Sequence, residues 1–454
     1  LRVMPHRQRA TLAMPHANRL RSHAKNRRRG QCAGATIVSM KDLSQHLPTR
    51  LIHHDYIAPE GFASPVIAVH KASTVIFPSV AAMRSRQWKN KSSYTYGLHG
   101  TPTTFTLEER LCSLEGGLHC VLVPSGLAAI ANVSLALLKT GDEVLIPDNA
   151  YGPNQSMAQA TLAQFGIRHA LYDAMDVADL AAKITPATRL VWLEAPGSVT
   201  MEFPDLPAMV RLCRARGVTT ALDNTWGAGL AFAPFDLTGD ASYDLGADIS
   251  IHALTKYPSG GGDVLMGSVI TRSPALHRKI QELHMHLGLG VGANDAEAVL
   301  RSLPSIALRY RAHDVAARTL AHWLQQQSPV VQVLHPALPD APGHANWQAL
   351  CGAANGGDGA AAGLFSVVID ARYSQAQVDA FCDALQLFKL GYSWGGAMSL
   401  VVPYDLAAMR QQPAAQVQPG TVVRFSIGLE AVDDLQRDLA QALERAFGAL
   451  QPTQ

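Results

Sequence analysis

The sequence has no apolar stretch long enough to cross a membrane. A spanning helix needs about 20 consecutive apolar residues, and the longest candidate, Ala360 to Ile369, is half that length. The six cysteines are scattered, without a CxxC pair or nearby histidine ligands. Such cysteines are typical of reduced thiols inside the cell. We therefore predict a cytoplasmic protein that does not bind membranes.

Acidic residues are missing from the first 40 positions, whereas the first 30 hold nine Lys or Arg. Subtracting these nine from the chain's net charge of +2 leaves residues 31–454 with a net charge of −7. A mildly acidic body argues against nucleic-acid binding. We interpret residues 1–39 as a basic, disordered extension, and an organelle-type address is the alternative.

Nucleotide and metal motifs are also missing. No strand-led GxGxxG or Walker loop is present; Gly288–Gly292 imitates one, but no strand precedes it. The pairs His53-His54 and His284/His286 have no third ligand at a suitable spacing. We predict neither a nucleotide-dependent enzyme nor a metal site.

Short apolar runs alternate with helical stretches from about residue 118 to 270. This alternation predicts an α/β fold with a largely parallel sheet that is covered on both faces. A long helical stretch is expected over residues 296–326, and beyond about residue 300 the pattern indicates a smaller α+β domain. We expect an N-terminal arm over residues 40–100, a large domain over 101–300 and a small C-terminal domain over 301–454. The predicted strands of the large domain are residues 120–123, 143–147, 189–193, 219–222, 248–251 and 264–270.

Polar residues follow these runs, and ligands bind at the carboxyl ends of parallel strands. Lys256 and Asp223 follow two of them. An amine and a carboxylate at one sheet edge suit pyridoxal phosphate (PLP): the lysine forms a Schiff base, and the carboxylate keeps the pyridine nitrogen protonated. The competing interpretations are a surface lysine and a helix N-cap aspartate.

Four further positions fit a PLP site. Gly126 begins a helix, where free N–H groups suit a phosphate, and Thr255 could add a hydroxyl group. Tyr151 could stack on the ring. Arg424 lies in an apolar strand and needs an anion, such as the α-carboxylate of an amino acid. The alternatives are an ordinary turn, loop packing and a structural salt bridge.

Ordered motifs over most of the chain resemble the PLP-dependent enzymes of cysteine and methionine metabolism, and within them the cystathionine β-lyase branch. The matching stretches are Tyr94–Thr103, Leu114–Gly117, Asp148–Pro153, Leu193–Ser198, Asp223–Trp226, Thr255–Tyr257, His335–Pro339, Tyr392–Gly396 and Ile427–Asp434. The resemblance implies the fold type I architecture, with a seven-stranded sheet in the large domain. It also implies a homotetramer, a dimer of dimers whose active sites lie between two chains.

The resemblance also implies roles for individual cofactor ligands. Lys256 corresponds to the Schiff-base lysine and Asp223 to the partner of the pyridine nitrogen. Tyr151 corresponds to the ring-stacking tyrosine, and Gly126 and Leu127 to the backbone ligands of the phosphate.

Further roles concern the substrate and the neighbouring chain. Tyr96 corresponds to a tyrosine that the neighbouring chain contributes, and with Lys256 and Tyr151 it makes up the implied catalytic set. Arg424, helped by Ser393 and with Trp394 beside it, corresponds to the clamp for the substrate carboxylate.

Two positions depart from the family pattern. Leu98 stands where an arginine usually meets the phosphate, and Ala253 stands where a serine is common. Both changes remove phosphate contacts. We predict that His99 or another cation compensates, or that PLP is held less tightly than is typical.

The resemblance implies β-elimination of L-cystathionine to homocysteine, pyruvate and ammonia, in methionine biosynthesis; cystine or cysteine could react likewise. The nearest alternative is a γ-acting relative, a cystathionine γ-synthase or γ-lyase. Pro196–Ser198 and Tyr392–Gly396 resemble the β branch, and Trp226 could narrow the cavity. A regulatory protein that uses the basic tail as its contact surface is a more distant alternative.

Overall fold

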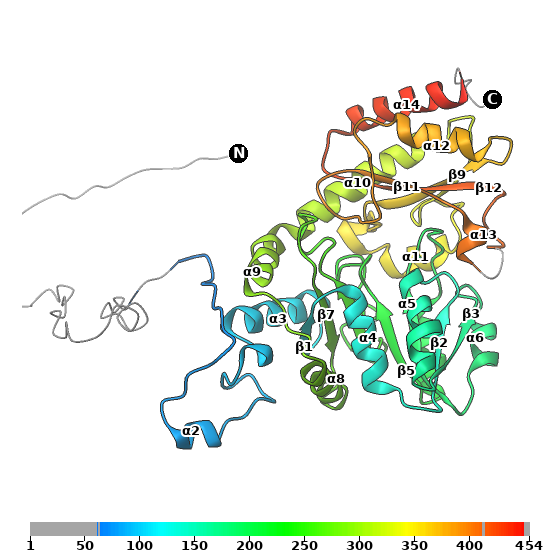
Figure 1. Ribbon diagram of the computed structural model, residues 1–454. Helices are drawn as coiled ribbons and strands as arrows, with labels where there is room; N and C mark the ends of the chain where they lie inside the picture. The colour runs from blue at the N-terminus through cyan, green and yellow to red at the C-terminus, as the bar shows by residue number, and fades with distance from the viewer. Residues whose placement is uncertain (1–60, 62–63, 411–413, 449–454) are drawn as a thin grey trace, which may run out of the picture. The chain divides into compact units, whose positions relative to one another are not determined.

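A computed structural model describes residues 61, 64–410 and 414–448 (Figure 1). Residues 66–454 form one compact unit, and it holds both of the sheets in the described part of the chain. The extension predicted for residues 1–39 lies outside the described residues. No helix in the described part is both long and apolar enough to cross a membrane.

A seven-stranded sheet forms the centre of the larger body, in the order β1-β7-β6-β5-β4-β2-β3. The pairs from β6 through β5, β4 and β2 to β3 are parallel, and β7 runs antiparallel to both β1 and β6. The mostly parallel sheet predicted from the sequence is thus confirmed. The strands are β1 His119–Val123, β2 Glu143–Pro147, β3 Arg168–Tyr172, β4 Thr188–Glu194, β5 Thr219–Asp223, β6 Ile249–Ala253 and β7 Gly267–Thr271.

Helices cover both faces of this sheet because consecutive strand residues point to opposite sides. Trp192 of β4 packs in the core beneath α4 (Gly126–Leu137) and α8 (Pro274–Leu287), whereas the adjacent Leu193 packs beneath α7 (Leu206–Ala215). The other helices of this body are α3 Pro102–Glu115, α5 Gly152–Met157, α6 Val177–Lys183 and α9 Ala293–Ser302, with a π-helical turn over Ala158–Leu162.

A second sheet of five strands has the order β10-β11-β12-β9-β8. Helices α12 and α14 lie over it, as Figure 1 shows at the top of the view, and they share its core of leucine, valine and phenylalanine side chains. The elements are β8 Val330–Leu334, β9 Leu364–Asp370, β10 Lys389–Leu390, β11 Leu400–Tyr404, β12 Gly420–Ser426, α10 Ile306–Leu324, α11 His344–Cys351, α12 Gln375–Ala384, α13 Leu406–Met409 and α14 Val432–Phe447.

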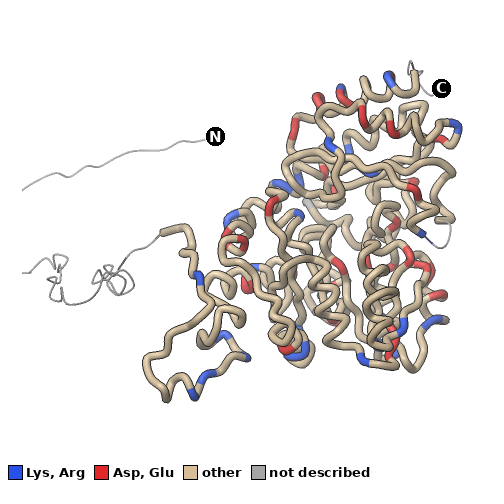
Figure 2. Tube along the Cα trace, viewed as in Figure 1, with Lys and Arg blue, Asp and Glu red and all other residues tan. Residues whose placement is uncertain are grey.

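The described part of the arm precedes α3. It contains the short helix α2 (Val80–Arg84), an isolated bridge between Thr74 and Tyr96, and a 3-10 turn over Gly97–His99. Charged residues of both signs are interspersed over the helices of the molecule, and the arm beyond α2 carries mainly basic ones (Figure 2).

Two details differ from the sequence-based expectation. The helix expected over residues 296–326 is interrupted after α9 by a 3-10 turn at Leu303–Ser305, because Pro304 cannot donate a helical hydrogen bond. The strand expected from residue 264 begins only at Gly267, where β7 meets Ala253 of β6. The loop of residues 254–266 therefore connects two paired strands.

Candidate active site

The sheet brings three of the predicted polar exits to one edge. Glu194 and Asp223 are the last residues of β4 and β5 and face each other in the parallel register. Asp223 is also in register with Ile251 of β6, and Lys256 follows that strand by three residues. The carboxyl edge of the sheet thus carries two acids and one amine, as the strand order requires.

Lys256 is half-buried, and its amine contacts two neighbouring side chains. Its Nζ donates a hydrogen bond to Ser393 Oγ over 3.0 Å and lies 5.1 Å from the centroid of the Trp394 ring. The pKa of Lys256 is lowered to about 8, chiefly by burial and also by the positive charge of Arg424, while the negative charge of Asp223 partly opposes both effects. The amine is therefore neutral far more often than an exposed lysine at the same pH.

Asp223 is a half-buried acid at the end of β5. One carboxylate oxygen accepts the backbone N–H of Thr225 over 3.0 Å. Burial raises the pKa of the Asp223 carboxyl, and the hydrogen bonds from Thr225 only partly offset that effect. A cation placed against the second oxygen would stabilise the ionised form.

The N-terminus of α4 forms an open cradle beside β6. Ser125 caps the helix by accepting the N–H of Ala128, so the N–H groups of Gly126 and Leu127 are free of helical partners. A Cβ on Gly126 would lie 2.7 Å from the Cβ of Ala253, a distance that forces the backbone to shift. Only glycine allows this approach, and the free N–H groups can bind an anion.

Glu194 has a role that the sequence did not reveal. Its carboxylate accepts the backbone N–H of Tyr151 over 2.8 Å and so fixes the start of the turn that carries this ring. Burial, together with the charge of Asp223, raises the pKa of Glu194 well above its ordinary value. Tyr151 itself is 42% exposed, as a ring that covers a ligand must be. Glu194 and Tyr151 are 43 residues apart in sequence, so no local sequence pattern predicts their contact.

Arg424 is buried without a counter-ion. It is 6% exposed, and no ion pair of the described residues includes it. Its Nη2 donates to the carbonyl oxygen of Tyr392 over 2.8 Å, and its guanidinium lies 5.3 Å from the centroid of the Tyr404 ring. The structural salt bridge considered as an alternative is absent from the described chain. A guanidinium with this environment is suited to an external carboxylate.

Three predicted residues lie elsewhere or are already engaged. Thr255 Oγ1 lies 3.4 Å from the amide nitrogen of Met266 and 3.5 Å from its carbonyl oxygen. Tyr96 makes an edge contact with His99 of the arm, 5.9 Å between centroids. Trp226 packs edge-on against Phe203 with 5% exposure, and its narrowing of the cavity stays a prediction.

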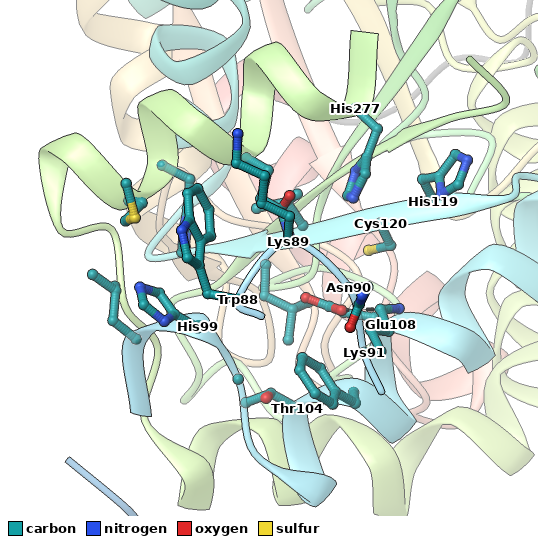
Figure 3. A pocket seen from close by; sticks show the side chains of 18 of the residues that line it. Trp88, Lys89, Asn90, Lys91, His99, Thr104, Glu108, His119, Cys120 and His277 are labelled. Carbon is teal, nitrogen blue, oxygen red and sulfur yellow. Dashed lines mark ion pairs between the residues drawn. The ribbon is translucent and has the colours of Figure 1, made fainter. Parts of the chain in front are cut away.

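His99 lines a different cavity, of about 390 Å³, between the arm and the elements α3, β1 and α8 (Figure 3). Its Nδ1 lies 2.7 Å from Thr95 Oγ1 and its ring stacks on Trp88. Burial lowers the pKa of His99, which disfavours the cationic form. The prediction that His99 or another cation compensates for the missing arginine stays a prediction.

A buried ion-pair network lies behind Tyr151 and was also missed. Arg410, at the C-terminus of α13, pairs with Asp148 over 2.7 Å and with Glu202 over 2.8 Å. Asn149 donates to the second oxygen of Glu202 over 2.8 Å. The network ties the loop that leads into Tyr151 to the smaller sheet domain.

The residues present fit PLP. The free N–H groups at the start of α4 can donate hydrogen bonds to a phosphate. The second carboxylate oxygen of Asp223 can accept a hydrogen bond from a protonated pyridine nitrogen. The Lys256 amine, whose lowered pKa favours its neutral form, can attack an aldehyde. Together with the sheet, this edge defines a PLP-binding α/β enzyme of fold type I.

Comparison with known proteins agrees with this class. Residues 48–444 match the model of the family described as Cys/Met metabolism PLP-dependent enzyme. The chain is 38% identical to cystathionine beta-lyase of Bordetella avium over 90% of this chain and 100% of that protein, and 35% identical to cystathionine beta-lyase of Salmonella typhimurium over 88% and 99%. It also resembles the crystal structure of cystathionine gamma synthase from Xanthomonas oryzae in complex with aminoacrylate and cysteine, with 29% identity and a TM-score of 0.72 over 84% of this chain and 93% of that one. The chain belongs to the PLP-dependent Cys/Met metabolism family.

Proposed function

We propose that the protein cleaves L-cystathionine by β-elimination to homocysteine, pyruvate and ammonia. Relatives with the name cystathionine beta-lyase match nearly the whole chain. One observation carries the proposal: Arg424, which has no acidic partner among the described residues, donates to the carbonyl oxygen of Tyr392, and the half-buried Lys256, whose pKa is lowered, donates to the adjacent Ser393. This arrangement suits an amino acid that is held by its carboxylate and deprotonated at Cα.

When bound, PLP supplies an electron sink that stabilises negative charge at the substrate Cα. We assign the aldehyde of PLP to Lys256 and its pyridine nitrogen to Asp223. We assign the ring face to Tyr151, and the phosphate to Gly126, Leu127 and Thr255. The assignment rests on the free N–H groups at the start of α4 and on the half-buried carboxylate at the end of β5.

The substrate is held by its carboxylate. We assign the guanidinium of Arg424 to this group, with the Ser393 hydroxyl as a second donor once it is released from Lys256. Trp394 limits where the rest of the substrate lies, because its ring packs against Tyr257 at 5.6 Å between centroids and so has little freedom to move. Binding at two donors fixes the orientation of the Cα–H bond.

Lys256 is the base in this proposal. Its neutral Nζ takes the Cα proton, and the electron pair left at Cα then forms a Cα=Cβ double bond while the Cβ–S bond breaks with its electron pair leaving on sulfur. The 2-aminoacrylate that is released reacts with water to give pyruvate and ammonia. The thiolate needs a proton; Tyr151 and the protonated Lys256 are the donors that we assign to this step. Burial favours the first transfer because it raises the neutral fraction of the amine.

We infer a homotetramer in which Tyr96 reaches the site of a neighbouring chain. The arm supports this inference, because Ile76 is 91% exposed, Val66 is 65% exposed and Tyr96 is 45% exposed. Large apolar side chains at such exposure are typical of an association surface. We also propose the cytoplasm as the compartment, in keeping with five described cysteines that are all free and buried.

Product analysis tests the reaction. The holoenzyme is incubated with L-cystathionine, and both keto acid and thiol products are identified by mass spectrometry. Pyruvate with homocysteine is expected. The γ reaction, which the similarity to cystathionine gamma synthase keeps as the second candidate, would give 2-oxobutyrate with cysteine and would overturn the proposal.

A further inference from the structure

Arg424 depends on an aromatic ring for its position. In the antiparallel pair of β11 and β12, Val402 is directly opposite Arg424, and Tyr404 is opposite Val422. Tyr404 and Arg424 are therefore diagonal neighbours on the same face of the sheet, where long side chains reach each other. The guanidinium carbon lies 5.3 Å from the centroid of the Tyr404 ring.

The partners of Arg424 are neutral. Besides the Tyr404 ring, it contacts the carbonyl oxygen of Tyr392, and among the described residues it has no acidic partner. Burial lowers the pKa of Arg424, and no ion pair among the described residues offsets the desolvation of this cation. A cation–π contact stabilises a guanidinium without neutralising its charge. The full charge stays available to a ligand.

The Tyr404 ring is also positioned from the other side. It is half-buried and makes an edge contact with Tyr392, 6.4 Å between centroids. Tyr404 therefore contacts both Arg424 and the residue whose carbonyl oxygen accepts a hydrogen bond from that arginine. The Tyr404 side chain, with these contacts, can hold the guanidinium of Arg424 toward the substrate site.

We propose that Tyr404 is a positioning residue for substrate binding, whose ring holds Arg424 as an uncompensated cation for the α-carboxylate of the amino acid. This rests on the proposed function only in assigning Arg424 to the carboxylate. The aromatic face carries the effect, and the hydroxyl group contributes little. Cation–π contacts contribute about 0.5–2 kcal/mol, according to how far they are desolvated, and a tenfold change in affinity corresponds to about 1.4 kcal/mol.

The test compares Tyr404→Leu, which removes the ring, with Tyr404→Phe, which keeps it. L-Alanine, which has a carboxylate but no leaving group at Cβ, is titrated into each PLP-loaded protein, and Kd is read from the cofactor absorbance. We expect Tyr404→Leu to weaken L-alanine binding by about 3- to 30-fold and Tyr404→Phe to bind within about twofold of the unchanged protein. In turnover, KM should rise in Tyr404→Leu while kcat changes little, because the reacting atoms are untouched.

Tyr373→Leu is the matched control. Tyr373 stacks on Arg372 at 4.9 Å in the same domain and remote from the site, so its loss should leave the Kd for L-alanine unchanged. L-Alaninamide, which lacks the carboxylate, should bind weakly and equally to the unchanged protein and to Tyr404→Leu. Equal L-alanine affinity in Tyr404→Leu and the unchanged protein would overturn the role of Tyr404. These titrations do not depend on which bond the enzyme cleaves, so failure of the proposed elimination would show separately, in the product analysis.

Discussion

The chemistry of a single amine, Lys256, depends on where the chain buries it. A lysine with a pKa of about 8 is neutral in about one molecule in ten at pH 7 and in about nine of ten at pH 9, whereas an unperturbed lysine is almost wholly protonated at both. The fold thereby prepares a nucleophile before any cofactor arrives. Burial is the larger cause, and Arg424 adds to it.

This environment predicts how capture of the cofactor depends on pH. Only the neutral amine attacks the aldehyde, so the rate of PLP binding to the apoprotein should rise about tenfold from pH 7 to pH 9 and then level off. Stopped-flow absorbance measures it. Arg424→Gln removes a positive charge, so it should raise the pKa of Lys256 and move the profile to higher pH. A profile unmoved in this variant, or moved to lower pH, would contradict the assignment.

At the scale of elements, the N-terminus of α4 determines how the phosphate is held. Gly126→Ala places a Cβ 2.7 Å from that of Ala253 and must displace the N–H groups. Hydrogen bonds to a charged group contribute about 1.5–3 kcal/mol, so the Kd for PLP should increase about 10- to 100-fold, as measured by titrating the apoprotein. Gly152→Ala is the control, because Gly152 also begins a helix but has no atom within 4 Å of an added Cβ; an equal loss in both variants would refute the crowding argument.

The elements that the sequence predicted well are the fully buried ones. The apolar run of β6 is unambiguous because helices cover both of its faces, and the exits of β5 and β6 placed Asp223 and Lys256 at one edge. Strand β3 was missed because it lies at the edge of the sheet, where Arg168 is exposed and the pattern is mixed. The contact between Glu194 and Tyr151 could not be foreseen, since it depends on strand order rather than on spacing.

At the scale of the whole molecule, Arg410 joins the two sheet-bearing parts. Its partner Asp148 is 262 residues away in sequence, and the side chains of Arg410, Asp148 and Glu202 are all less than 10% exposed. No local sequence motif could predict such a contact. Because Asp148 begins the loop that ends at Tyr151, the network links the position of the smaller domain to the site.

Removing the arginine should therefore destabilise the fold strongly. Arg410→Met leaves two buried carboxylates without a cation, and breaking a buried pair in this way costs about 3–5 kcal/mol. We expect the free energy of unfolding in urea to fall by that amount. Arg372→Met removes an exposed arginine that lies 3.5 Å from Asp370 and should cost less than about 1 kcal/mol. Similar losses in the two variants would show that Arg410 is no more than a surface charge.

The loop of residues 254–266 is pinned at both ends, by β6 and by the antiparallel β7. Because these strands are paired, the backbone of Lys256 would keep its position if an incoming amino acid displaced its amine from a bound cofactor. The released Lys256 amine would stay close to the cofactor carbon to which it had been bonded. At the end of each turnover the same amine could therefore bond to the cofactor again, because its effective concentration in the pocket is far above that of any free amine in solution.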